Sequence, residues 1–208
     1  MTKQRRSAFF AAGLLFVASI ADSAHAAPSD QSYVANPGNL SFAHGLYVAI
    51  GPCAHVRTSV DGKVWTERSS GTPSSLHAIT FGNGLFVAVG NEGAVVSSPD
   101  GVSWTVADSR TDERLRAIAF GAGIFVAVGY AGTIVTSKDG AHWRQRASGT
   151  EERLSAVCHR AGRFIATATN GIMLSSKNGR DWKRQNSSSS FMCGCQISSY
   201  FSRGTGLK

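Results

Sequence analysis

The tryptophans of this chain recur at a constant interval, and this spacing constrains the fold more than any other feature. They are 39 residues apart, at Trp65, Trp104, Trp143 and Trp182. Three further sets keep the same interval: Phe42, Phe81, Phe120 and His159; Gly45, Gly84, Gly123 and Gly162; Tyr47, Phe86, Phe125 and Phe164. Four sets in one register indicate four copies of one structural unit.

Each copy has the pattern of four short strands. In the second copy, apolar β-prone runs cover residues 76–81, 85–89, 94–98 and 104–107, with glycine-containing turns between the first three and Pro-Asp-Gly before the last. Links this short join only antiparallel neighbours, so each copy predicts a four-stranded meander. Meanders packed side by side can bury both faces. We therefore expect an all-β fold, a β-propeller of four-stranded antiparallel blades; a β-solenoid is the alternative, although its repeat is usually shorter.

The turn before each tryptophan reads Ser-x-Asp-Gly, or Ser-x-Asn-Gly in the last copy. An Asp or Asn side chain can accept hydrogen bonds from amides two residues on, and Gly supplies the positive φ of a tight hairpin. Equivalent residues of successive blades lie far apart around a rim, so we predict no catalytic, metal or cofactor site from them. The predicted structural turn residues are Asp61, Gly62, Trp65, Asp100, Gly101, Trp104, Asp139, Gly140, Trp143, Asn178, Gly179 and Trp182.

These turns, together with FGNGLFVAVG (81–90) and FGAGIFVAVG (120–129), resemble the Asp-box, or BNR-repeat, β-propellers of bacterial exported proteins. The resemblance covers about residues 37–186. It departs from the usual pattern in two ways: one residue fewer separates Asp from Gly, and Asn178 replaces Asp in the last copy. The family includes sialidases, sortilin-like receptors and photosystem II assembly factors, so the resemblance implies a fold and leaves the activity open.

Residues 1–26 have the pattern of a secretory signal peptide. Three basic residues precede an uncharged apolar stretch at 8–21, and Ala-His-Ala at 24–26 fits the cleavage rule. The stretch is too short for a membrane anchor, so we expect a periplasmic or secreted protein, exported by the general route rather than the twin-arginine route. A linker at 27–36, a propeller at 37–186 and an irregular tail at 187–208 would follow.

The mature chain would be basic. Without the signal it has 18 Lys and Arg against 12 Asp and Glu, a formal charge of +6, concentrated in the last third before the tail. This charge suits either an anionic polymer of the cell envelope or a solvated face that keeps an exported protein soluble. No nucleic-acid-binding motif accompanies it, so we expect no specific nucleic-acid partner, and no run after the signal is long enough to span a membrane.

A binding face is expected at one end of the blades. In the propeller family, the turns between second and third strands share a face with the links between blades, and such loops commonly carry function. The candidate ligand-binding residues there are Glu92, Glu113, Arg114, Tyr130, Glu152, Arg153 and Asn170.

Two of these links, DERL (112–115) and EERL (151–154), are one repeat apart. We predict a non-enzymatic binding scaffold for a protein or an anionic polysaccharide. One alternative is a glycoside hydrolase of the sialidase type, in which arginines hold a carboxylate sugar and a Glu acts as acid or base. The same charges could equally form exposed ion pairs, and a truncated propeller without an independent function is a third alternative.

The cysteines and the tail leave closure of the ring open. Disulfides are allowed in an exported chain, and we expect at most one bridge among Cys53, Cys158, Cys193 and Cys195. The repeat stops after the fourth copy. Either the tail pairs with the first copy and closes a four-bladed ring, or the copies form an open arc whose exposed edges self-associate; the pattern favours the arc.

Overall fold

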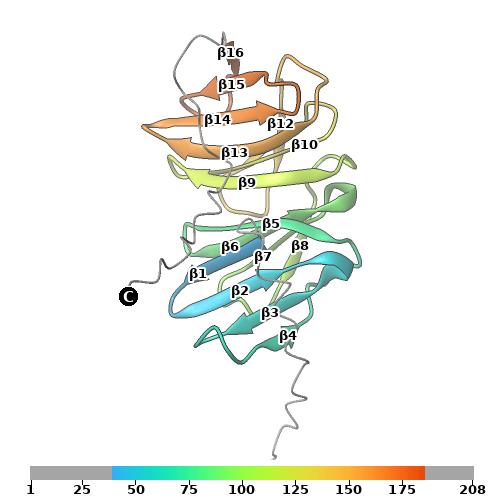
Figure 1. Cartoon of the computed structure of the whole chain (residues 1–208), viewed down its shortest axis with the longest axis vertical. Coiled ribbons are helices and arrows are strands. Elements are labelled where there is room, and N and C mark those ends of the chain that lie inside the picture. Colours follow the sequence, from blue (N-terminus) through green and yellow to red (C-terminus); the bar gives the residue numbers. More distant parts are fainter. Residues whose placement is uncertain (1–38, 186–208) are drawn as a thin grey trace, which may run out of the picture.

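The computed structural model describes residues 39–185, so the predicted signal peptide, linker and tail lie outside the described residues. The described chain contains sixteen strands in four separate antiparallel sheets of four strands each. In every sheet the spatial order is the chain order. Figure 1 shows the four sheets following one another along the long axis. The prediction of four antiparallel meanders is confirmed, and each sheet is called a blade below.

The last three blades have the same strand lengths, and the first blade has shorter first and second strands. The first contains β1 (Leu40–Ala43), β2 (Leu46–Ile50), β3 (Val56–Ser59) and β4 (Thr66–Arg68). The second contains β5 (Leu76–Gly82), β6 (Leu85–Gly90), β7 (Val95–Ser98) and β8 (Thr105–Ala107). The third contains β9 (Leu115–Gly121), β10 (Ile124–Gly129), β11 (Ile134–Ser137) and β12 (Arg144–Arg146). The fourth contains β13 (Leu154–Arg160), β14 (Arg163–Ala168), β15 (Met173–Ser176) and β16 (Lys183–Gln185). Two short 3-10 turns, η3 (Pro52–Ala54) and η4 (Asn91–Gly93), join second to third strands.

A cross-strand aromatic pair recurs at one register position of every blade. Its members are Phe42 and Tyr47, Phe81 and Phe86, Phe120 and Phe125, and His159 and Phe164. Their ring centroids lie 4.4 to 4.8 Å apart. In the last three blades the second-strand ring is almost completely buried. Each such buried ring contributes about 1.5–3 kcal/mol, so Phe86, Phe125 and Phe164 are core residues, whereas Phe42 of the first blade is 56% exposed.

The hydrophobic core is divided among the three seams between neighbouring blades. Each seam has its own cluster of buried residues, and the tryptophan of the later blade packs in it: Trp104, Trp143 and Trp182. The innermost strands approach closely at these seams. A Cβ on Gly82 would lie 2.0 Å from Cγ of Phe120, and one on Gly121 would lie 2.1 Å from Cγ of His159. Glycine is therefore required where the ring of the next blade sits.

The blades form an open arc. Close contacts join β1 with β5, β5 with β9 and β9 with β13, whereas no comparably extensive contact joins the first and fourth blades within residues 39–185. The expected incompletely closed propeller is thus what the described chain forms. Cys53 and Cys158 do not form a disulfide with each other. Cys193 and Cys195 lie outside the described residues, as does any strand of the tail that could close the ring.

Candidate functional site

The turns between second and third strands and the links between blades meet on one side of the arc, here called the loop face. Backbone hydrogen bonds join each turn to the link that precedes its blade. The amide of Asn91 donates to the carbonyl of Ser75 (2.9 Å), that of Tyr130 to Arg114 (3.0 Å) and that of Thr169 to Arg153 (3.2 Å). Because these residues are one repeat apart, the same connection is built three times.

Each link is held by a buried serine. The hydroxyls of Ser70, Ser109 and Ser148 donate to a carbonyl two residues on, at 3.1, 2.9 and 2.9 Å, and all three serines are at most 8% exposed. The links also pack closely against the turns, since a Cβ on Gly129 would lie 2.1 Å from the carbonyl oxygen of Arg114. The backbone of the loop face is therefore held in place by repeated hydrogen bonds and close contacts.

Tyr130, in the β10–β11 turn, stands between two arginines from different links. The guanidinium carbon of Arg153 lies 5.3 Å from the ring centroid and that of Arg114 lies 5.8 Å from it, both within cation–π range. Nη1 of Arg153 also donates to the tyrosine hydroxyl at 3.3 Å. This hydrogen bond is the main cause of a lowered pKa for Tyr130, and the charges of both arginines act in the same direction.

His77 extends this group toward the second blade. Its Nε2 lies 2.6 Å from Oδ1 of Asn91 and 3.0 Å from Nε of Arg114. The two contacts compete for one nitrogen, which donates to Asn91 in one neutral tautomer and accepts from Arg114 in the other. Burial lowers the pKa of His77, the Asn91 contact opposes this, and the charges of Arg114 and Arg116 lower the pKa further. These effects favour the neutral form of the imidazole beside the arginines.

A β-bulge directs side chains to this region in three blades. The register shifts at the start of β5, β9 and β13 leave His77, Arg116 and Ser155 as the extra residues, each one repeat from the next. The Nε atom of Arg116 is buried and has no hydrogen-bond partner among the described residues. Arg116 also contributes positive charge near His77, whose pKa it lowers.

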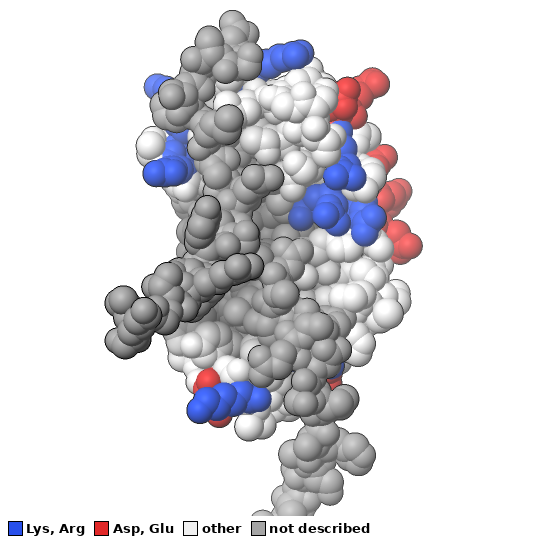
Figure 2. Space-filling view, viewed as in Figure 1, with Lys and Arg blue, Asp and Glu red and all other residues white. Residues whose placement is uncertain are grey.

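The loop-face arginines lack acidic partners. Arg114, Arg116 and Arg153 form no ion pair with any carboxylate of residues 39–185. Glu113 and Glu152 precede two of them, but both acids are exposed, and their amides are bound to Thr111 and Thr150 hydroxyls. Figure 2 shows one group of basic side chains on the right of the view, with acidic ones next to it along the edge, and further basic side chains at the left, top and bottom.

The structure brings together only some of the residues that the sequence singled out. Arg114, Tyr130 and Arg153 form one group, as described above. Glu92 lies in η4 and accepts a hydrogen bond from the Ser74 hydroxyl (3.1 Å), whereas Asn170 accepts one from the amide of Ile172 (3.1 Å) within its own turn. Within residues 39–185, neither Glu92 nor Asn170 forms a hydrogen bond or ion pair with Tyr130, Arg114 or Arg153.

Sequence reasoning missed His77 and Arg116. A single histidine and arginine inside strand patterns look like ordinary β residues. They could have been found by their spacing of one repeat. Both lie near the start of the innermost strand, close to the links that form the predicted face.

The Ser-x-Asp-Gly turns lie at the opposite ends of the strands. Oδ1 of Asp61 accepts hydrogen bonds from the amides of Lys63 (2.8 Å) and Val64 (3.0 Å) and from the Ser59 hydroxyl (2.9 Å). These bonds hold its pKa at about 2, with the amide of Val64 the largest cause. Asp100 repeats the arrangement with a pKa of about 2, and the pKa of Asp139 is lower still because His142 adds amide and ring contacts. In each turn Oδ1 is occupied by groups of the same turn, so this is a structural arrangement.

Within residues 39–185 no group of three or more His, Cys, Asp or Glu side chains could hold a metal ion. No helix in the same range has the length and apolar character needed to cross a membrane.

Comparison with known proteins supports the architecture. No family model and no curated protein matches the chain. Among solved structures it is similar to YCF48 from Cyanidioschyzon merolae (TM-score 0.56, 17% identity, 73% of this chain and 56% of that one) and to YCF48 bound to a D1 peptide (0.55, 18%, 70% and 51%). The Neurospora crassa Pan2 WD40 domain is also similar (0.53, 15%, 73% and 50%). The chain spans about half the length of these structures, and the likeness shows a β-propeller fold.

Proposed function

We propose that this chain is an exported, non-enzymatic propeller that binds acidic segments of a partner protein through its loop face. One observation carries the proposal: Tyr130 lies between Arg114 and Arg153, and neither arginine has an acidic partner in the described chain. A carboxylate can pair with both guanidiniums, while the tyrosine ring offers an apolar surface beside them.

A protein ligand is favoured over a polysaccharide because the face is aromatic and only locally charged. Aromatic and arginine side chains are enriched where protein interfaces gain most of their binding energy. The structurally similar YCF48 has been captured with a bound peptide, so a propeller of this kind can present a peptide-binding surface. An anionic polysaccharide would use the same arginines and is the competing outcome of the test below.

The turn geometry supports placing this chain among the Asp-box, or BNR-repeat, propellers. In all four blades, Asp or Asn accepts from two following amides, although one residue fewer separates it from Gly than in the usual pattern. Export rests on the signal pattern of residues 1–26. Intact mass of the protein recovered from the periplasm or medium tests it: a mature chain beginning at residue 27 supports export, and an uncleaved cytosolic product contradicts it.

The binding test uses the mature chain, residues 27–208, as bait for envelope extract and then for synthetic acidic peptides from any captured protein. Changing both Arg114 and Arg153 to Ala should weaken peptide binding at least tenfold, or about 1.4 kcal/mol. The matched control changes Arg160 and Arg163, two exposed arginines in the β13–β14 hairpin, to Ala. Equal binding by both double variants contradicts the proposal, and selective retention of an anionic polysaccharide assigns the face to that ligand instead.

A sialidase-type hydrolase is the second candidate, and one observation favours it: the hydroxyl of Tyr130 is hydrogen-bonded to an arginine that lowers its pKa. A tyrosinate nucleophile requires that hydroxyl, whereas peptide binding mainly uses the ring. Tyr130→Phe therefore separates the two. Unchanged peptide affinity within about threefold supports binding. Turnover on a glycoside panel that disappears in Tyr130→Phe would support the enzyme.

A further inference from the structure

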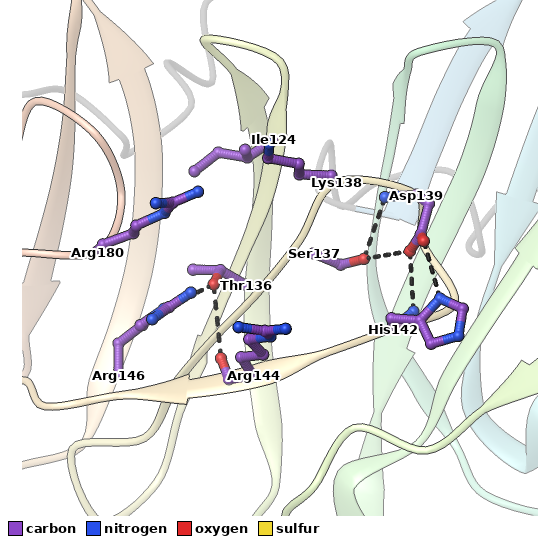
Figure 3. Close-up of a pocket in the computed structure, with 9 residues that line it drawn as sticks. All are labelled: Ile124, Thr136, Ser137, Lys138, Asp139, His142, Arg144, Arg146 and Arg180. Atoms are coloured by element: carbon purple, nitrogen blue, oxygen red, sulfur yellow. Dashed lines mark hydrogen bonds and ion pairs between the residues drawn. The ribbon is translucent and has the colours of Figure 1, made fainter.

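A pocket of about 380 Å³ opens on the other side of the arc, between the outer edge of the third blade and the turn of the fourth. Four of its lining residues are cationic: Lys138, Arg144, Arg146 and Arg180. Figure 3 shows Arg144 and Arg146 rising from β12, with Arg180 facing them from the fourth blade. The pocket involves none of the loop-face residues discussed above.

Local structure fixes where these guanidiniums sit. Arg144 and Arg146 are two residues apart on a strand, so both side chains leave the same face of β12. Nε of Arg146 donates to Oγ1 of Thr136 at 2.9 Å. Arg180 belongs to the Ser-x-Asn-Gly turn, where its amide donates to Oδ1 of Asn178 at 2.9 Å. Two arginines from one strand and one from the next blade are thereby held at a single opening.

The positive charge of this pocket is not neutralised locally. None of the four cations forms an ion pair within residues 39–185. The carboxylate of Asp139 lines the pocket, but it is occupied by the Ser137 hydroxyl and by the amide and ring of His142. Burial lowers the pKa of Arg146, and the charges of Arg180 and Arg144 lower it further, with Asp181 opposing them. The unliganded pocket thus carries unfavourable like-charge contacts.

The repeat shows that packing does not require this charge. The positions of Arg144, Arg146 and Arg180 are occupied at the second seam by Thr105, Ala107 and Ala141. At the first seam they are Thr66, Arg68 and Val102. Nε of Arg68 donates to Oγ1 of Thr58 at 3.0 Å, as Arg146 does to Thr136, so that pair is a structural element of the blade. Packing between the blades therefore does not explain the arginines at positions 144 and 180.

We propose that this pocket is a second ligand site, which binds a phosphate or sulfate group. Guanidinium forks match the oxygens of such groups in paired hydrogen bonds, and a dianion relieves the repulsion among three arginines better than a single carboxylate. The Thr136 hydroxyl adds a polar group to the lining. The ligand is either the free anion or an ester of it on a larger molecule, and the site is independent of the proposed loop-face function.

The test measures thermal stabilisation and calorimetric binding of the mature chain with inorganic phosphate, inorganic sulfate and glycerol phosphate. Chloride at equal ionic strength provides the baseline. The key variant, Arg144→Thr, Arg146→Ala and Arg180→Ala, gives the third seam the residues found at the second, so it should fold. A charge-matched control changes Lys63, Arg160 and Arg163, which are exposed and distant in sequence from the pocket, to Ala.

The wild type and control should be stabilised by phosphate or sulfate, and the key variant should bind at least tenfold more weakly. Tighter binding of glycerol phosphate than of inorganic phosphate identifies an ester as the ligand, and the reverse identifies the free anion. Circular dichroism verifies folding, and the single variants Arg144→Thr and Arg180→Ala repeat the test if the triple variant is unfolded. Equal stabilisation of wild type and key variant, or an equal loss in the control, overturns the proposal.

Discussion

The first Ser-x-Asp-Gly turn and the three inner ones have the same local chemistry in different surroundings. In all four, the Asp or Asn accepts from two following amides, and Gly has φ between +68° and +73°. The inner glycines are buried against the preceding blade, and the indole Nε1 of each inner tryptophan donates to a glycine carbonyl at 3.0 Å. Gly62 is exposed, and no preceding blade lies against it within the described chain.

This comparison separates the formation of a turn from its contribution to stability. The turn forms wherever its residues occur, because its hydrogen bonds are local. Its contribution to the free energy of folding depends on the neighbouring blade, which buries the glycine and the indole. The first turn therefore serves as an internal control for the other three, and substitutions at equivalent positions can test the difference.

The largest expected effect is at the tryptophans. Trp143 is 3% exposed and packs in the second seam, so Trp143→Ala should lower the free energy of unfolding by about 3–5 kcal/mol. Trp65 is only half-buried, and Trp65→Ala should cost less than half as much. Urea unfolding of residues 27–208, followed by circular dichroism, measures both. Equal losses would show that burial of the indole in the seam adds no stability beyond that of the local turn.

Glycine substitutions should show a smaller difference in the free energy of unfolding, again with the larger loss at the inner turn. Both Gly62→Ala and Gly179→Ala place a side chain at positive φ, which costs about 1–2 kcal/mol. The added Cβ at Gly179 would also lie 2.5 Å from Cδ1 of Ile124, whereas at Gly62 the nearest atom is 3.7 Å away. Gly179→Ala should therefore lower the free energy of unfolding by about 1 kcal/mol more than Gly62→Ala does. The same unfolding assay applies, and a larger loss at Gly62 would contradict the seam contact.

The acid dependence of stability should follow the turn carboxylates. Asp61 and Asp100 have pKa values of about 2 when folded, against an ordinary 3.8. A lowered folded pKa gives stability that is complete above about pH 4 and is lost as the pH falls toward 2. Changing Asp61 and Asp100 to Asn, the residue that already serves at position 178, should flatten this part of the profile. Melting temperatures between pH 2 and pH 5 measure it, and an unchanged slope would contradict the assigned hydrogen bonds.

The smallest effect on stability is expected at the exposed apolar residues of the first turn. Val60 and Val64 are 77% and 72% exposed, while the equivalent inner positions carry Lys138 and Ser103. Val60→Lys with Val64→Ser should change the free energy of unfolding by less than about 0.5 kcal/mol. If this uncovered edge drives self-association, sedimentation at high concentration should show less of it in the variant. Association that is unchanged would place the contact elsewhere.

The strand pattern of the second blade was predictable almost residue by residue. No observed strand end differs from the expected run by more than one residue, and the differences include the starts at Val95 and Thr105. The reason is that turn residues and alternating apolar residues act locally. Trp104 was expected inside the last strand, but it lies just before β8, where its indole donates to the carbonyl of Gly101.

The loop-face group was only partly predictable. Arg114 and Arg153 could be found because they recur one repeat apart in similar links. Their convergence on Tyr130 could not, since it depends on how the links before and after the third blade lie beside its turn. The bulges at His77 and Arg116 also could not be predicted from a pattern of alternating residues, because a bulge inserts one residue without changing the composition.

The sequence by itself determined the repeat, the four meanders and the turns that join their strands, because each depends on hydrogen bonds and side-chain alternation within a few residues. Only the tertiary structure decided which turns are buried, that the arc of described blades stays open, and which arginines from separate links and blades share one site. Those properties arise from contacts between copies 39 residues or more apart, and the rotation between packed blades is not encoded in any single copy.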